Sequence, residues 1–353
     1  MDTLTRSFIP YEKIETLIEQ SLAEKGRVRT VLEKARELKG LEPEECAVLL
    51  NAQDPELIQE IFNTARFVKD TIYGKRLVFF APLYLSNYCT NNCTYCGFRA
   101  ENKEMVRHAS SQDEIREQVT ILEKQGHKRL MVLTGEHPVR SSLDYLIESL
   151  ETIYNVKTEN GEIRRINVEI APLSIEEFSR LKKAKIGTYV CFQETYHPEV
   201  YDKIHPYGPK SDYYSRLHVM DKAVQGGIDD YGIGALYGLT DHRFEVLSLL
   251  YHAQHMDSVY GVGPHTISVP RLEPAQNAPT ANNVPHPVSD IEFKKIVAIL
   301  RCAVPYTGII LTTREKPEIR AELLDLGISQ ISAGSRTSPN GYSDEDENAQ
   351  FAL

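Results

Sequence analysis

The stretch that decides the fold reads Pro82-Leu-Tyr-Leu-Ser-Asn-Tyr-Cys89-Thr-Asn-Asn-Cys93-Thr-Tyr-Cys96-Gly-Phe98. A predicted strand runs into a polar loop that carries the spacing Cys-x3-Cys-x2-Cys. Three thiolates on one tight loop can ligate three irons of a cubane cluster, and the missing fourth cysteine leaves one iron open to a small molecule. The spacing therefore predicts a catalytic [4Fe-4S] centre held by Cys89, Cys93 and Cys96.

Two other interpretations of the cysteine loop stay open. A zinc site would need a fourth Cys or His nearby, and the next histidine in the sequence, His108, stands at no familiar spacing. Three buried cysteines used as small hydrophobic side chains would not call for a loop rich in Asn and Thr. Of the other cysteines, Cys46 and Cys302 are predicted to be core thiols, and Cys191 is ambiguous.

Outward from this loop, short apolar runs alternate with amphipathic stretches of helical length. Capping-box pairs begin several helices, and glycines follow others where the chain is expected to turn left-handed. The alternation predicts an α/β fold, a (β/α)8 TIM barrel, whose chemistry lies at the C-terminal ends of the strands. The expected strands are 77–85, 129–134, 164–170, 188–193, 230–235, 265–270, 308–312 and 328–332. The capping boxes are Ser111/Glu114, Ser174/Glu177 and Ser289/Glu292, and the glycines are Gly126, Gly187 and Gly327.

The barrel is expected to occupy residues 76–342, with other structure on either side. Residues 1–75 are rich in Glu, Lys, Leu and Ala and predict an N-terminal helical extension with helix starts at Pro10, Pro43 and Asp54. The acidic, polar segment 343–353 is expected to be flexible.

Composition narrows the class of protein. A net charge of -10 would repel a phosphate backbone, so no nucleic-acid partner is expected. No apolar run is long enough to span a membrane, and the N-terminus lacks the pattern of a secretory signal. We therefore expect a soluble, cytoplasmic protein, in which six cysteines do not form a disulfide framework.

With Tyr95 before its last cysteine, the triplet resembles the radical S-adenosylmethionine (SAM) superfamily. The resemblance implies that SAM chelates the open iron and that an electron passed to its sulfonium gives a 5'-deoxyadenosyl radical. It also implies three SAM-binding elements after predicted strands or on the next helix. The tripeptide Thr134-Gly135-Glu136 would accept hydrogen bonds from the SAM amino group, Glu194 would hold the ribose hydroxyls, and Arg216 would bind the SAM carboxylate. The alternatives are an ordinary turn, a solvated loop carboxylate and a surface arginine.

Longer strings narrow the family: Phe192-Gln-Glu-Thr-Tyr-His197, His205-Pro-Tyr-Gly-Pro-Lys210, Gly263-Pro-His265-Thr-Ile-Ser-Val-Pro-Arg271-Leu and Ser332-Ala-Gly-Ser335-Arg336-Thr. They resemble the aromatic amino acid lyases of the superfamily, and above all the HydG family of [FeFe]-hydrogenase maturases. The resemblance implies cleavage of the Cα–Cβ bond of L-tyrosine to p-cresol and dehydroglycine. It also implies an external one-electron reductant and other hydrogenase maturation proteins as partners. The sister family is the tyrosine lyase (2-iminoacetate synthase) of thiamine thiazole biosynthesis.

Three further site residues follow from this resemblance. Ser335 and Arg336 would form the clamp for the tyrosine carboxylate, a task that suits a hydroxyl and a two-pronged guanidinium. His265 matches a histidine that helps to hold an extra iron of a second cluster in the maturases. A salt-bridged loop residue for Arg336 and a core residue for His265 are the alternatives.

The sequence also departs from the family pattern. The maturases carry a C-terminal domain with three more cysteines for an auxiliary cluster, whereas no cysteine follows Cys302 here. We expect either a truncated maturase or a natural short form, releasing p-cresol from tyrosine with little carbon monoxide. A non-catalytic iron-sulfur protein and a zinc-stabilised assembly protein are the alternatives from other classes.

Overall fold

Eight parallel strands close into the predicted barrel. They are β1 (Val78–Ser86), β2 (Arg129–Thr134), β5 (Arg165–Glu169), β6 (Tyr189–Val190), β7 (Tyr231–Gly234), β8 (Thr266–Ser268), β9 (Gly308–Leu311) and β10 (Gln330–Ser332). Around the barrel the order is β1-β10-β9-β8-β7-β6-β5-β2, so the first strand pairs with the last. The computed structural model describes residues 6–343 and 349–351.

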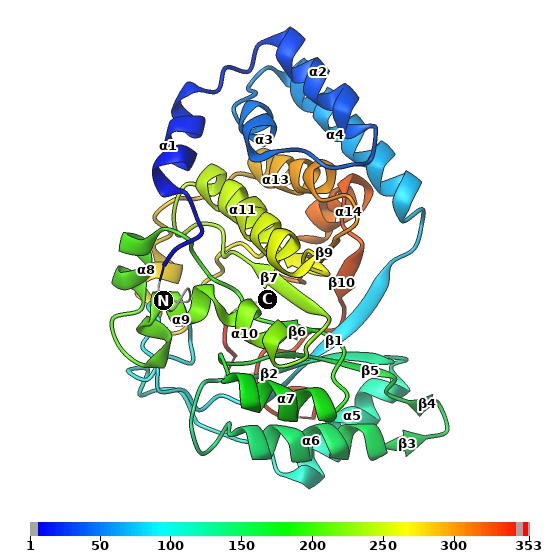
Figure 1. Ribbon diagram of the computed structural model, residues 1–353. Coiled ribbons are helices and arrows are strands. Elements are labelled where there is room, and N and C mark those ends of the chain that lie inside the picture. The colour runs from blue at the N-terminus through cyan, green and yellow to red at the C-terminus, as the bar shows by residue number, and fades with distance from the viewer. Residues whose placement is uncertain (1–5, 344–348, 352–353) are drawn as a thin grey trace.

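Helices surround this barrel (Figure 1). They are α5 (Gln112–Lys124), α6 (Leu143–Asn155), α7 (Ile175–Lys183), α8 (Pro198–Ile204), α9 (Tyr213–Leu217), α10 (Val219–Gln225), α11 (His242–Tyr260), α12 (Pro279–Asn282), α13 (Asp290–Ala303) and α14 (Pro317–Leu326), with a short 3-10 helix η2 (Pro209–Ser211). All three predicted capping boxes form, at the starts of α5, α7 and α13. Each box satisfies amide groups of the first turn that have no partner within the helix.

Between residue 6 and β1, four more helices are described. They are α1 (Tyr11–Gln20), α2 (Lys25–Ala35), α3 (Pro43–Leu50) and α4 (Pro55–Ile72). Three begin where the sequence predicts: α1 follows Pro10, α3 starts at Pro43, and Asp54 caps α4 by accepting a hydrogen bond from the Glu56 amide. Helices α3 and α4 pack on α11, α13 and α14, at one end of the molecule in Figure 1.

Some local features differ from the prediction. A hairpin of β3 (Lys157–Thr158) and β4 (Gly161–Glu162) lies between α6 and β5. Gly126 is left-handed as expected, but Gly187 and Gly327 are not. These two are tightly packed instead, because a Cβ would stand 2.5 Å from Arg165 Nε at Gly187 and 2.9 Å from Arg301 Cβ at Gly327.

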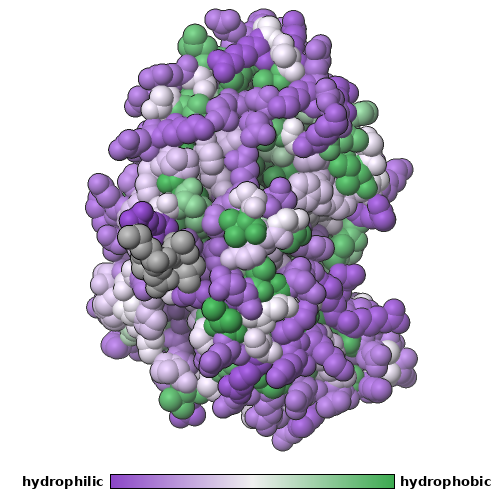
Figure 2. Space-filling model, viewed as in Figure 1, coloured by the Kyte–Doolittle hydropathy of each residue, from purple (hydrophilic) through white to green (hydrophobic). Residues whose placement is uncertain are grey.

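The two ends of the chain differ in how much is described. Most of the segment predicted to be flexible, 343–353, lies outside the described residues, but Gln350 and Phe351 are described and pack against the barrel mouth. Among the described residues, no helix combines the length and the apolar content needed to cross a membrane. The face seen in Figure 2 is mostly hydrophilic, with hydrophobic residues scattered over it.

The barrel interior contains its own small apolar layer. Phe80, Met131, Val190 and Ile310, from β1, β2, β6 and β9, pack together separately from the main core. The main core lies between the strands and the outer helices. The layer fills the barrel below the strand ends, which leaves the space above it for a site.

Candidate active site

The loop after β1 brings the three predicted cluster cysteines to one cavity. Cys89, Cys93 and Cys96 all line this space, which we call the cysteine cavity, together with residues that follow β2, β5 and β6. Backbone bonds fix the loop: the Thr90 amide donates to the Glu136 carbonyl at 2.9 Å, and the Thr94 amide donates to the Ile204 carbonyl at 3.0 Å. The three thiols are therefore held near one another before any metal binds.

The environment of the thiols suits a cationic centre. Burial raises the pKa of Cys89 to about 11, and burial likewise raises the pKa of Cys93 and Cys96. Buried thiolates need a positive charge beside them, and iron supplies such a charge when it coordinates sulfur. Cys46 and Cys302 are fully buried in the main core, as predicted, whereas Cys191 lines the cysteine cavity.

Gly135 is needed for its lack of a side chain. It follows β2 and lies so close to the cysteine loop that a Cβ would stand 2.4 Å from the Tyr88 carbonyl oxygen. Its amide donates to the Ser86 carbonyl at 2.8 Å. The next residue, Glu136, is thereby directed into the cavity, where Asn91 Nδ2 donates to its Oε2 at 2.6 Å.

Four charged side chains form one network across this cavity. Arg216 on α9 lies 3.1 Å from Glu136 and 3.6 Å from Glu194, and Lys210 lies 2.7 Å from Glu194. Although burial favours its neutral form, Lys210 and Arg216 hold the pKa of Glu194 below its usual value. Two carboxylates and two cations thus face the space beside the cysteines, where a zwitterionic ligand would find partners for both of its charges.

Glu194 is held in a strained conformation by a brace on α11. Its φ is +69°, which is unfavourable for a residue with a side chain. Directly after it, the Thr195 hydroxyl and the Tyr196 amide both donate to the carboxylate of Glu245, the latter at 3.0 Å. Burial raises the pKa of Glu245 to about 8.

A second space, the inner cavity, adjoins the cysteine cavity and reaches down to Phe80, Met131 and Ile310. Its wall after β9 and β10 holds Arg314 and Ser335. Arg314 Nε and Ser335 Oγ are buried and have no hydrogen-bond partner among the described residues. The Phe351 ring lies 3.5 Å from the Arg314 guanidinium carbon. A cation and a hydroxyl with unused donors, above an apolar floor, suit a ligand with one anionic end and one apolar end.

The structure does not bring Arg336 to this cavity. Its side chain is exposed, while Ser335 and Thr337 on either side of it line the cavity. The guanidinium next to Ser335 therefore faces solvent in this structure. The guanidinium at the cavity comes instead from Arg314.

His265 is also away from the cavity. It directly precedes β8, at the N-terminal end of the barrel, and its side chain is 56% exposed beside Asp230. The cysteine loop follows a strand, at the opposite end, so His265 does not join the cysteines.

Three residues of the site were missed by the sequence analysis: Lys210, Glu169 and Arg314. Glu169 ends β5, and burial raises its pKa to about 7. Arg314 follows β9 by three residues. The position of Glu169 at the end of β5 and that of Arg314 after β9 could have drawn attention to them. Lys210 lies on η2, which follows α8 and not a strand, and so gave no such signal.

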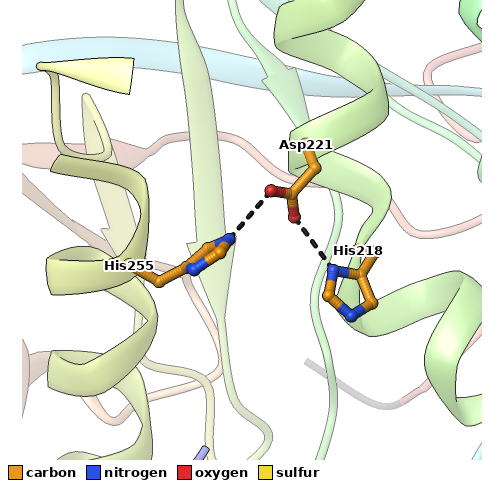
Figure 3. Close-up of side chains that lie close together, drawn as sticks. All are labelled: His218, Asp221 and His255. Atoms are coloured by element: carbon orange, nitrogen blue, oxygen red, sulfur yellow. Dashed lines mark hydrogen bonds and ion pairs between the residues drawn. The ribbon is translucent and has the colours of Figure 1, made fainter. Parts of the chain in front are cut away.

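A different cluster lies outside the barrel mouth. His218, Asp221 and His255 come together between α9, α10 and α11 (Figure 3). His218 lies 3.2 Å and His255 2.8 Å from the Asp221 carboxylate, and the other ring nitrogen of His218 lies 2.7 Å from the Arg6 carbonyl oxygen. Hydrogen bonds account for this arrangement, which ties the N-terminal segment to the barrel helices.

Comparison with known proteins gives the family of this chain. The family model described as the Radical SAM superfamily matches residues 83–250, and the Biotin and Thiamin Synthesis associated domain matches residues 268–350. The 2-iminoacetate synthase of Salmonella typhimurium is 31% identical over 321 residues, which are 91% of this chain and 82% of that protein. The chain belongs to the radical SAM superfamily.

Solved structures show which members of the superfamily this radical SAM protein resembles. A crystal structure of HydG, a maturase of the [FeFe]-hydrogenase, is 52% identical with a TM-score of 0.96, covering 99% of this chain and 76% of that chain. HydG from Carboxydothermus hydrogenoformans is 46% identical with a TM-score of 0.88, covering 97% of this chain and 77% of that chain. The predicted likeness to HydG is confirmed.

The residues of the cysteine cavity fit the cofactors of radical SAM proteins. Three buried thiols could hold a [4Fe-4S] cluster, Gly135 leaves room beside them, and the charged network faces the same space. Glu136, Glu194 and Arg216 are the residues that we would assign to SAM. Thr134, also predicted for SAM, lines the same cavity.

Proposed function

We propose that this radical SAM protein is a tyrosine lyase that cleaves the Cα–Cβ bond of L-tyrosine to p-cresol and dehydroglycine. The observation that carries the proposal is the inner cavity, which joins the cysteine cavity and has a buried cation and hydroxyl on one wall. When bound, the cluster and SAM would supply a 5'-deoxyadenosyl radical that removes a hydrogen atom from the substrate amino group. The chain's own residues then bind and orient the amino acid.

Arg314 and Ser335 would hold the substrate carboxylate. The guanidinium Nε and the hydroxyl have no hydrogen-bond partner in the described part of the chain, and charge-assisted bonds from such donors fix the orientation of an anion. The substrate side chain would lie over the apolar layer of Phe80, Met131 and Ile310. Burial of the substrate side chain would exclude water from the Cα–Cβ bond that breaks.

On the cofactor side, Glu136, Glu194 and Arg216 would bind the charged groups and ribose of SAM, with Lys210 setting the charge of Glu194. These groups are ordered by one another and by the cysteine loop, so little rearrangement is needed on binding. An external one-electron reductant would complete the reaction.

The biological role that we propose is maturation of an [FeFe]-hydrogenase, together with other maturation proteins. The identity of 52% to a HydG structure, against 31% to a 2-iminoacetate synthase, supports this role over thiamine thiazole biosynthesis. Growth restored by this chain to a mutant lacking 2-iminoacetate synthase would reverse that assignment. Failure to mature an [FeFe]-hydrogenase would not do so by itself, because little carbon monoxide is expected from a chain without cysteines after Cys302.

An anaerobic assay tests the chemistry. Reconstituted protein is incubated with SAM, dithionite and L-tyrosine, and 5'-deoxyadenosine and p-cresol are measured by chromatography. We expect both products with tyrosine, and no indole-derived product with tryptophan. Formation of 5'-deoxyadenosine without p-cresol would refute the lyase while leaving the radical SAM assignment intact.

A further inference from the structure

We propose that Glu169 is the base that removes a proton from the substrate amino group before the radical step. The inference rests on the lyase activity proposed above. Glu169 is the last residue of β5, and it lines both the cysteine cavity and the inner cavity.

The meeting point of the two cavities is where the substrate amino group must lie. Arg314 and Ser335 line the inner cavity but not the cysteine cavity, whereas Glu136 and Arg216 line the cysteine cavity but not the inner cavity. A substrate held at its carboxylate by the first pair can meet a radical generated beside the second pair only across the wall that both cavities share. The base must therefore belong to that shared wall.

The shared wall offers two carboxylates among the described residues, Glu169 and Glu194, and no His, Lys or Arg. Glu194 is engaged by Lys210 at 2.7 Å and Arg216 at 3.6 Å, which stabilise its charged form. No ion pair joins Glu169 to another described side chain, although the charges of Lys210 and Arg216 act on it from a longer distance. Glu169 is thus the carboxylate that remains available to a substrate.

The backbone places Glu169 firmly. It pairs with Leu133 on β2 and with Val190 on β6, so neighbouring strands fix it on both sides. Val168 before it belongs to the core between strands and helices, and alternation along the strand therefore directs Glu169 into the barrel. A catalytic group on a strand is held more rigidly than one on a loop.

The chemistry needs a base at this point. An amino acid enters from water with its amino group as an ammonium. Loss of a hydrogen atom from an ammonium would leave a radical cation, whereas loss from a neutral amine leaves a neutral aminyl radical. In the step that we assign to Glu169, one N–H bond breaks heterolytically, the electron pair stays on nitrogen, and the proton passes to a carboxylate oxygen. No electron enters or leaves in this step.

The charges around Glu169 suit a base at neutral pH. Burial raises its pKa, and Glu194 after β6 raises it further. Arg314 after β9, Lys210 on η2 and Arg216 on α9 oppose this effect, and the pKa comes to about 7. Tyr84 on β1 faces the same group. A general base works best when its pKa lies near the working pH, because it is then both ionised and basic.

The test compares wild type with Glu169→Gln, which keeps the shape but cannot accept the proton, and Glu169→Asp, which keeps the carboxylate. Glu123→Gln is the matched control, since Glu123 is a fully buried carboxylate on α5, outside the barrel mouth. We expect p-cresol formation to fall about 10²- to 10⁴-fold in Glu169→Gln. Glu169→Asp should recover part of the rate, and Glu123→Gln should keep it.

Two further readouts separate a base from a structural residue. In wild type, p-cresol formation should rise with pH through the region of about 7, and this limb should vanish in Glu169→Gln. Equilibrium binding of tyrosine to cluster-loaded protein with S-adenosylhomocysteine, measured calorimetrically, should change by less than about tenfold. Tyrosine-independent cleavage of SAM should stay at the wild-type level.

The outcomes distinguish this inference from the proposed function. If wild type makes 5'-deoxyadenosine but no p-cresol, the lyase proposal fails. If wild type makes p-cresol and Glu169→Gln makes it at the same rate with the same pH profile, Glu169 is not the base. Loss of tyrosine binding in Glu169→Gln would also overturn the inference, because the residue would then be a binding group.

Discussion

Arg314 and Arg336 show that the direction of a side chain decides whether it reaches the inner cavity. Both follow strands that end at the barrel mouth, but only Arg314 lines the inner cavity, while Arg336 is exposed. The sequence pattern predicted Ser335 and Arg336 together, as neighbours in the chain. In the structure Ser335 lines the inner cavity and Arg336 is exposed, so we expect only the serine of this pair to contact the ligand.

The two arginines give the first prediction, with one as the control for the other. Arg314→Ala removes charge-assisted hydrogen bonds worth about 1.5 to 3 kcal/mol, or a factor of about 10 to 150. The KM for tyrosine in p-cresol formation should rise accordingly, and Arg336→Ala should leave it near wild type. A raised KM in Arg336→Ala with an unchanged KM in Arg314→Ala would mean that Arg336 binds the carboxylate, as the sequence predicts.

The cysteines give a second prediction. Cys93→Ala should lose the cluster and all cleavage of SAM, because two thiolates on one loop do not hold a cubane. Cys302→Ala, in the main core, should keep the wild-type iron and sulfide content. Iron analysis and the absorbance of reconstituted protein check both, and a full iron complement in Cys93→Ala would contradict the assignment.

At the scale of elements, the brace between α11 and the segment after β6 is the feature with most consequence. Glu245 accepts hydrogen bonds from Thr195 and Tyr196, next to the strained Glu194. The surrounding structure must offset the cost of such a backbone conformation, about 1 to 3 kcal/mol. The brace is therefore expected to fix a proposed SAM ligand.

This brace yields a prediction about pH. The pKa of Glu245 is raised from 4.5 to about 8, so between these values the folded protein keeps a proton that the unfolded chain releases. Because the folded state then binds more protons, stability should fall as pH rises through this window. Urea midpoints against pH should show a flatter dependence in Glu245→Gln than in wild type. Parallel curves would mean that Glu245 is ionised in the folded protein.

The elements themselves were largely predictable, for physical reasons. All eight barrel strands lie within or beside their predicted ranges, since buried parallel strands are short apolar runs between helices. The start of α2 was not predicted, because it has no capping pattern in the sequence: the Glu24 side chain makes no capping hydrogen bond. Lys210 and Glu245 also escaped prediction, since their roles depend on contacts between segments distant in sequence.

At the scale of the whole molecule, the N-terminal segment is tied to the barrel helices through His218, which directly follows α9. His218 joins the Arg6 carbonyl to Asp221, and the Phe8 ring stacks on His255 at 3.9 Å between centroids. Asp221 receives bonds from both histidines and from Tyr260. Although burial raises the pKa of Asp221, the bonds from His218 and His255 hold it well below its usual value.

Asp221 therefore gives a prediction about stability. A carboxyl with a lowered pKa contributes stability above its unfolded value of 3.8, and that contribution is lost as pH falls further. Asp221→Asn should destabilise the protein by about 3 kcal/mol at neutral pH, since it breaks a buried charged network. Urea denaturation measures the loss, and SAM cleavage at low denaturant should remain as the control. An unchanged midpoint would show that the cluster does not anchor the segment.

The order of strands around the barrel divides the mouth into two sectors. The cysteine loop, Glu136 and Glu194 follow β1, β2 and β6, and Glu169 ends β5, which lies between β2 and β6. Arg314 and Ser335 follow β9 and β10. The two matched family models fall on either side of the same division, at residues 83–250 and 268–350. With this layout, substitutions after β9 and β10 can change the proposed substrate site without changing the residues that surround the cluster. Grafting different loops after β9 and β10 would be a practical route to changing the substrate of this enzyme, because the residues proposed to hold the cluster and SAM would stay unchanged.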